Sequence, residues 1–410
     1  MKTFPKSILI SNENLQNNSV PFIIHGQGVM LFNTEKNIES CKMNIQDNDN
    51  INQLSIEITK NNTKIINLTT KEEYIDLNND SGLIDTPGSF YWFSLDSQNQ
   101  ILRIGIGEAR LETLIYEYKF SHKDNYEENK VFLESLMYIE YESVIIPFKL
   151  LRDPIVSHVP LCVKDTDGLT MDYIAQNKYL PHSNLSPISQ ILYNCISGNR
   201  FVLDDRDFPE FSKAIEYSIS TPGCWCYETL KSKSKEFNPT HPNIDETYLR
   251  ITLGKNSGES PGIPYVLEIW PPNHYSPVHS HASTDAIIRV LHGEINVQLF
   301  PYLSPQKIEP FGESTFKKDD ITWLSPQLNQ IHQLKNLNQT TTCITIQCYM
   351  YGKDNKIHYD YFDYVSEDEK IEQYEPDSDK DFVEFKELMK EEWENRVQEN
   401  CFYKLFMCKR

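Results

Sequence analysis

Two histidines, His279 and His281, stand one residue apart in the stretch SPVHSHASTD. Side chains two positions apart on a β-strand point to the same face, so these two imidazoles would converge. Imidazole nitrogen is a frequent ligand of divalent transition metals, and a strand leaves the pair little freedom to turn away. The spacing therefore predicts a metal site. The alternative is two ordinary polar residues on the solvent-exposed face of a strand.

The residues around the pair favour the metal site. A strand-like run, Tyr265–Trp270, precedes it, and the apolar run AIIRVL leads from it towards a turn glycine at Gly293. An HxH pair, a strand, a glycine turn and a returning strand make up the first motif of a cupin, a small β-barrel. A third ligand should follow on a strand that returns beside the first, and His332 in LNQIHQLKNL fits that place. We therefore expect one metal ion at these three histidines.

Around this motif, residues 187–351 resemble the cysteine dioxygenase family of cupin thiol oxidases, over less than half of the chain. LEIWPPNHYSPVHSH is similar to the family's segment of tryptophan, turn and HxH. On that match, His279 and His281 are the first two ligands of iron(II), and His332 is the third. The resemblance implies an enzyme: an iron(II)-dependent dioxygenase that converts L-cysteine and O2 to cysteine sulfinate.

The same resemblance assigns the substrate side of the site. Tyr248-Leu249-Arg250 is similar to the family's Tyr-x-Arg element, in which the arginine grips the substrate carboxylate and the tyrosine supports it. Tyr349 matches the tyrosine whose hydroxyl lies over the iron. The resemblance thus implies that Arg250 and Tyr349 are catalytic, and that both bind the substrate together with Tyr248. Their alternatives are an edge-strand aromatic for Tyr248, a surface charge for Arg250 and a core tyrosine for Tyr349.

The expected ligand set suits thiol oxidation. Three neutral imidazoles leave iron(II) its full positive charge, with open positions for an anionic thiolate and dioxygen. Because coordination lowers the pKa of the thiol, no dedicated base is required. Arg250 would hold the carboxylate so that the sulfur lies beside the bound oxygen, which is an orientation effect.

Three positions depart from the family pattern. Ala286 stands where many animal members carry a cysteine that crosslinks to the active-site tyrosine, so no such crosslink with Tyr349 can form. The neighbouring Asp285 should face away from the histidines on a regular strand. Thr345, Gln347 and Tyr349 share a face by period two, where the family usually has Ser, His and Tyr. Gln347 can exchange hydrogen bonds but carries no charge near neutral pH.

Other functions stay open at this stage. One is a dioxygenase of another small carboxylated thiol, such as 3-mercaptopropionate; Arg250 argues against cysteamine, which has no carboxylate, and leaves the need for an amine undecided. Another is a non-catalytic, metal-binding cupin sensor. The joint presence of Arg250, Tyr349 and three histidines favours catalysis, because a cupin fold needs none of them.

The elements that must position these residues are mainly strands. We expect a β-sandwich-like module at 1–125, a connecting segment at 126–186, a cysteine dioxygenase-like cupin with N-terminal flanking helices at 187–370, and an acidic amphipathic C-terminal helix at 371–410. The helix would pack on the outside of the barrel or bind a partner. Within the first module, SFYWFSLDSQNQILRIGIGE faintly resembles the lectin-like domain of farnesoic acid O-methyltransferase-type proteins.

Composition limits the partners. The 410 residues include 39 lysines and arginines against 59 acidic residues, and a net charge of −20 disfavours nucleic acid and anionic membranes as partners. The 9 cysteines are odd in number and form no CxxC pair, which favours a reducing, cytoplasmic setting. We expect a monomer whose partners are a small thiol substrate and O2.

Overall fold

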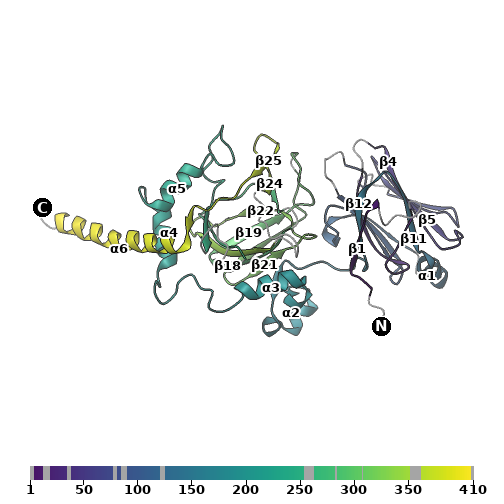
Figure 1. Ribbon diagram of the computed structural model, residues 1–410, viewed down its shortest axis with the longest axis horizontal. Coiled ribbons are helices and arrows are strands. Elements are labelled where there is room, and N and C mark those ends of the chain that lie inside the picture. Colours follow the sequence, from purple (N-terminus) through teal and green to yellow (C-terminus); the bar gives the residue numbers. More distant parts are fainter. Residues whose placement is uncertain are drawn as a thin grey trace. The chain divides into compact units, whose positions relative to one another are not determined.

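The computed structural model describes residues 4–12, 19–34, 38–76, 81–84, 90–120, 125–253, 263–281, 284–306, 308–350 and 362–407. The chain divides into two compact units, Met1–Val159 and Pro160–Arg410 (Figure 1). Among the described residues, no helix combines the length and the apolar character that a bilayer span requires.

The first unit is a β-sandwich, as predicted. Its strands are β1 (Ser7–Ile10), β2 (Ser19–Pro21), β3 (Gln27–Thr34), β4 (Ser40–Gln46), β5 (Gln53–Thr59), β6 (Thr63–Asn67), β7 (Glu72–Ile75), β8 (Phe90–Asp96), β9 (Ile101–Ile106), β10 (Leu114–Lys119), β11 (Tyr138–Glu142) and β12 (Val144–Leu151). They form two six-stranded sheets, in the orders β1-β12-β3-β8-β9-β10 and β2-β11-β4-β5-β6-β7. Alternate residues of β4, Cys41, Met43 and Ile45, are fully buried, as expected of a strand with one face on a core.

Residues 126–186, expected as a connecting segment, contribute to both units. Helix α1 (Tyr126–Ser135) is followed by β11 and β12, which pair with strands of both sandwich sheets. Farther on, β13 (Cys162–Lys164) pairs with a barrel strand, and α2 (Met171–Ala175) precedes β14 (Leu180–Pro181), which extends the same sheet. β13 and β14 have only three and two residues, so local periodicity alone does not identify them.

The second unit is the cupin-type barrel that the sequence predicts. Its further strands are β15 (Leu249–Leu253), β16 (Tyr265–Trp270), β17 (His279–Ser280), β18 (Asp285–His292), β19 (Glu294–Leu299), β20 (Gly312–Lys317), β21 (Ile321–Leu324), β22 (Ile331–Lys335), β23 (Cys343–Met350), β24 (Phe362–Val365), β25 (Ile371–Tyr374) and β26 (Lys380–Asp381). One sheet has the order β14-β13-β21-β18-β23-β16-β15-β26, and the other the order β20-β19-β22-β17-β24-β25.

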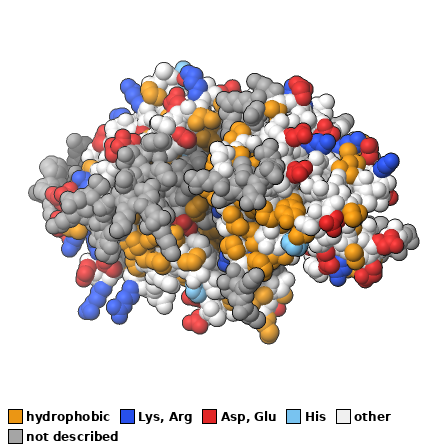
Figure 2. Space-filling model, turned by 45° about the vertical axis from the view of Figure 1, so that its right-hand side comes forward, with side chains coloured by type: hydrophobic (Ala, Val, Ile, Leu, Met, Phe, Trp, Pro, Cys, Tyr) orange, Lys and Arg blue, Asp and Glu red, His pale blue; other side chains and the backbone are white. Residues whose placement is uncertain are grey.

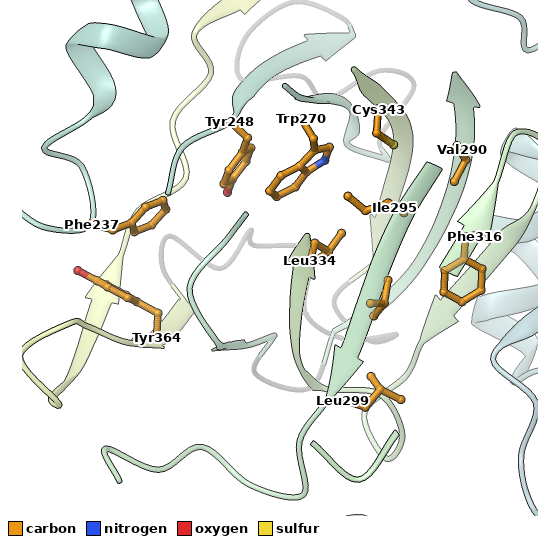
Figure 3. Close-up of a cluster of buried hydrophobic side chains, with 11 residues drawn as sticks. Phe237, Tyr248, Trp270, Val290, Ile295, Leu299, Phe316, Leu334, Cys343 and Tyr364 are labelled. Atoms are coloured by element: carbon orange, nitrogen blue, oxygen red, sulfur yellow. The ribbon is translucent and has the colours of Figure 1, made fainter. Parts of the chain in front are cut away.

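The two sheets of the barrel face each other across one apolar core (Figure 3). Trp270 and Val290 come from the first sheet, whereas Ile295 and Leu334 come from the second. The turn between β18 and β19 needs its glycine: Gly293 has φ +69°, and a Cβ there would lie 2.5 Å from the carbonyl oxygen of Thr342. The predicted sequence of strand, glycine turn and returning strand is therefore present.

Helices cover the outside of this barrel. They are α3 (Pro187–Ile196), α4 (Phe211–Ser220), α5 (Trp225–Lys233) and α6 (Phe382–Met407). Phe385 of α6 is fully buried, with its ring centroid 5.8 Å from that of Phe211 and 5.5 Å from that of Trp225. The C-terminal helix thus packs on the flanking helices. It begins at Phe382 and not at residue 371, since Ile371–Tyr374 and Lys380–Asp381 are strands. On the face drawn in Figure 2, acidic and basic side chains are interspersed.

Candidate metal centre

Two neighbouring strands bring the three histidines together. His279 on β17 lies directly opposite His332 on β22 in an antiparallel ladder, and His281 follows two residues after His279. Residues directly opposite on one face have Cβ atoms about 4.5–5.5 Å apart, and the i, i+2 spacing adds the third imidazole to the same face. The arrangement that the HxH spacing predicted is present in the fold.

The geometry of the triad fits a metal ion. The Nε2 atom of His281 lies 3.1 Å from that of His279 and 3.2 Å from that of His332. Ligand nitrogens about 2.0–2.1 Å from one ion, at angles between the octahedral and the tetrahedral value, are themselves separated by about 3 Å. One candidate ligand atom from each histidine falls in a group spanning 4.8 Å or less. The three side chains can therefore hold one ion between them.

Hydrogen bonds set the imidazoles in the state that a metal requires. Nδ1 of His279 lies 3.0 Å from the carbonyl oxygen of Pro277, and Nδ1 of His332 lies 3.3 Å from that of Asn329. A proton on each Nδ1, donated to these carbonyls, leaves the Nε2 lone pair for a ligand bond. Burial lowers the pKa of His279 to about 4, and burial with the neighbouring imidazoles holds the pKa of His281 well below its usual value. Both are thus neutral near pH 7.

The triad opens into a small cavity of about 50 Å³. A water-sized probe needs about 10–15 Å³, so the cavity has room for a ligand of only a few atoms. Its walls include every site residue that the sequence predicted, namely Tyr248, Arg250, His279, His281, His332 and Tyr349, and also Glu268, Gln347 and Phe362. The structure therefore places all six predicted residues around one space.

Tyr248 and Arg250 are interior residues. Tyr248 is 5% exposed, and its ring stacks on Trp270 with the centroids 4.3 Å apart (Figure 3). Arg250 lies on β15, between β16 and β26, and its side chain is 15% exposed. Its backbone N–H donates to Asp379 Oδ2 at 2.7 Å, which ties the strand to the segment before α6. The alternatives of an edge aromatic and a surface charge do not hold.

Tyr349 stands beside the histidines at the end of a polar row on β23. Its ring stacks with that of His281, with the centroids 6.2 Å apart and the planes 20° from parallel. The hydroxyl donates to Gln347 Oε1, and Gln347 Nε2 lies 3.3 Å from Thr345 Oγ1. The predicted row of Thr345, Gln347 and Tyr349 therefore exists. Asp285 faces away from it, as predicted, because it accepts hydrogen bonds from two serines of α3 and its N-cap.

Among the cavity residues that sequence reasoning missed, Glu268 is the charged one. It lies on β16, directly opposite Arg250 on one side and Thr345 on the other. Its Oε1 is 3.7 Å from Arg250 Nη1, and its Oε2 accepts a hydrogen bond from Gln347. Burial raises the pKa of Glu268 to about 7. A signal existed: in YVLEIW, period two puts this acid on the same face as Trp270, inside an otherwise apolar strand.

Comparisons with solved structures find likenesses to cupin-domain proteins. No protein-family model matches the chain. A solved Cupin_2 domain of an XRE family transcriptional regulator from Enterobacter cloacae is 13% identical over 26% of this chain and 98% of its own, with a TM-score of 0.21. The Schizosaccharomyces pombe Cnp3 cupin domain is 13% identical over 26% and 64%, with a TM-score of 0.20.

An oxalate oxidase structure is also similar, at 18% identity over 22% of this chain and 41% of its own, with a TM-score of 0.18. The chain thus spans less than half of that oxidase. These likenesses carry no argument about activity, and the cupin-type fold rests on the strand topology described above.

Proposed function

We propose that this protein is an iron(II)-dependent thiol dioxygenase that converts L-cysteine and O2 to cysteine sulfinate. The observation that carries the proposal is the shared cavity. Nε2 of His281 lies 3.1 and 3.2 Å from those of His279 and His332, all three ligand atoms fall within 4.8 Å of one another, and a largely buried arginine and tyrosine line the same space. The resemblance of residues 187–351 to the cysteine dioxygenase family supports the same assignment.

The donor set favours iron(II) with open positions. Among the described residues, the group of potential ligands consists of histidines alone, without a carboxylate. An ion held by three neutral imidazoles keeps its charge, and iron(II) there would supply positions for a thiolate and for dioxygen. Glu268 and Asp285, the acids nearest in sequence to the HxH motif on its flanking strands, bond to Gln347 and to serines instead.

The chain's own side chains supply binding and orientation. Arg250 presents a guanidinium to the cavity, where it would bind the carboxylate of a small thiol and fix the direction of its sulfur. Tyr349 holds its hydroxyl beside the histidines through Gln347. The ring of Phe362 lies 4.8 Å from that of His279 and 6.1 Å from that of His281, where it would limit the entry of water to the triad.

Oxygen uptake tests this function directly. The iron(II)-loaded protein should consume one O2 for each L-cysteine and release cysteine sulfinate, identified by mass. The metal-free protein provides the baseline, and the His241→Ala variant, which alters an exposed histidine outside the cavity, should match the wild type. Protein that holds its iron but takes up no oxygen with any small thiol would contradict the dioxygenase and leave a metal-binding sensor.

A further inference from the structure

We propose that Glu268 selects the ligand of this cavity: it favours a thiol that carries an amino group and disfavours a thiol that carries a carboxylate alone. This inference rests on the proposed thiol dioxygenase function and names the substrate class of the same site. It follows from three observations on the charges and hydrogen bonds that line the cavity.

The first observation is that Arg250 shares the cavity with an acid. Arg250 Nη1 and Glu268 Oε1 lie 3.7 Å apart, and their side chains are 15% and 7% exposed. This separation exceeds the 2.7–2.9 Å typical of a charge-assisted hydrogen bond, so the two groups face the cavity as a spaced pair. Because the histidines are neutral, an ionised Glu268 offsets the charge of Arg250. A carboxylate that approaches Arg250 therefore also approaches Glu268, and like charges repel.

The second observation is the direction of the hydrogen bonds through Gln347. An ionised carboxylate only accepts, so Gln347 must turn its NH2 group to Glu268 and its oxygen to Tyr349. The hydroxyl hydrogen of Tyr349 is then committed to Gln347, and its oxygen offers the cavity lone pairs. Glu268 and Tyr349 both present acceptors. An amino group, which donates hydrogen bonds, is the ligand group that such a pair suits.

The third observation is that Glu268 is buried while its ion pair with Arg250 spans 3.7 Å, so its charge is only partly stabilised. Burial raises its pKa to about 7, although Arg250, Gln347 and Lys233 each act to lower it. A ligand ammonium at this position would stabilise the ionised form. A zwitterionic aminothiol matches both members of the pair, whereas a thiol with only a carboxylate leaves Glu268 opposed by a like charge.

Calorimetric titration of the iron(II) protein without oxygen tests the proposal, since it measures binding and not turnover. The ligands are L-cysteine, cysteamine and 3-mercaptopropionate, and the variants are Glu268→Gln, of equal shape, and Glu246→Gln. Glu246 is a matched control: it is also buried with its pKa raised to about 7, and it lines a different cavity.

We expect the wild type and Glu246→Gln to bind L-cysteine more tightly than 3-mercaptopropionate. Glu268→Gln should shift this ratio towards 3-mercaptopropionate by about tenfold or more, since one lost charge contact is worth at least that factor. A preference that survives unchanged in Glu268→Gln comes from the metal and overturns the inference, as does a wild type that prefers 3-mercaptopropionate. If Glu268→Gln does not retain iron, Glu268→Asp replaces it, because the shorter side chain moves the charge. Glu268→Asp must then show part of the same shift in relative affinity, or the inference fails.

Failure of the underlying function looks different. If none of the three thiols binds to wild-type protein that holds iron, the thiol dioxygenase itself is contradicted. If the thiols bind and are oxidised but their relative affinities are the same in the wild type and in Glu268→Gln, the function stands and the role of Glu268 is overturned.

Discussion

Ala286 on β18 lies directly opposite Tyr349 on β23, and both side chains are buried in the same small apolar cluster. The position where many members of the resembled family carry a crosslinking cysteine is therefore the nearest cross-strand neighbour of the candidate active-site tyrosine. Only the thiol is missing. The ladder shows that the sequence match at Ala286 reflects a true neighbour relation in space.

The Ala286→Cys variant should consequently form a thioether with Tyr349 during turnover. The pair lies on the same face of adjacent strands, so the sulfur introduced by the substitution would reach the ring without a backbone shift. Intact-mass measurement after oxygen exposure of the iron-loaded variant with L-cysteine should show the loss of two hydrogen atoms. Ala286→Ser, which cannot crosslink, should keep its mass. An unchanged mass in an active Ala286→Cys protein would contradict the pairing of these two residues.

Removal of any one imidazole should release the metal. His279→Ala, His281→Ala and His332→Ala each leave two ligands from a set that encloses the ion, and we expect iron content after dialysis to fall from the wild-type level to near zero. The backbone carbonyl of Asn329 accepts from His332 Nδ1, and Asn329 has φ +65°, so Asn329→Val, which strains this backbone, should displace the acceptor and weaken iron retention about 10–100-fold. Elemental analysis measures both. Full iron content in His332→Ala would refute the three-histidine site.

Arg250 should affect substrate binding without affecting iron. Arg250→Lys keeps a positive charge beside Glu268 but loses the planar fork that binds a carboxylate with two hydrogen bonds. A lost charged hydrogen bond is worth about 1.5–3 kcal/mol, so we expect the KM for L-cysteine to rise by a factor of about 10 to 150. Steady-state oxygen uptake and iron content, measured on the same sample, check this. An unchanged KM would remove Arg250 from the binding site.

Sequence reasoning reached the triad because each step depends on local spacing. The convergence of the HxH pair follows from the two-residue period of a strand alone. Gly293 marks a turn in which φ is +69°, a value that favours glycine. Likewise, the row of Thr345, Gln347 and Tyr349 follows from alternation within one strand. The histidines and this row could therefore be identified from the sequence. Their convergence in space depends on the barrel, which the HxH motif itself predicts.

Sequence reasoning did not identify Glu268 because its neighbours in the cavity are set by the pairing between strands. Arg250 and Gln347 meet it only when β16 lies between β15 and β23, an order that no local pattern specifies. The same reason explains residues 126–186. Their short strands join sheets whose other members lie far along the chain, and β13 pairs with β21 across more than 150 residues. Alternation predicts a strand but not its partner.

Glu268 should make stability depend on pH in a particular direction. Its pKa is about 7 in the folded protein against an ordinary value of 4.5 for glutamate, so the folded state retains a proton that the unfolded chain releases between these values. The stability that this proton contributes is fully present below pH 4.5 and is lost as the pH rises to about 7. The loss amounts to about 3 kcal/mol, at about 1.36 kcal/mol for each unit of pKa.

The Glu268→Gln variant should lack that loss. Urea unfolding of metal-free protein at pH 5 and pH 8, followed by tryptophan fluorescence, reports mainly the second unit because all five tryptophans except Trp92 lie there. Other titrating groups, Glu246 among them, are common to both proteins, so they cancel when the pH dependence of the wild type is compared with that of the variant. The wild type should lose more stability than Glu268→Gln between these two pH values. Equal losses would mean that Glu268 titrates near its ordinary pKa, and that the acid opposite Arg250 is fully charged at neutral pH even without a ligand.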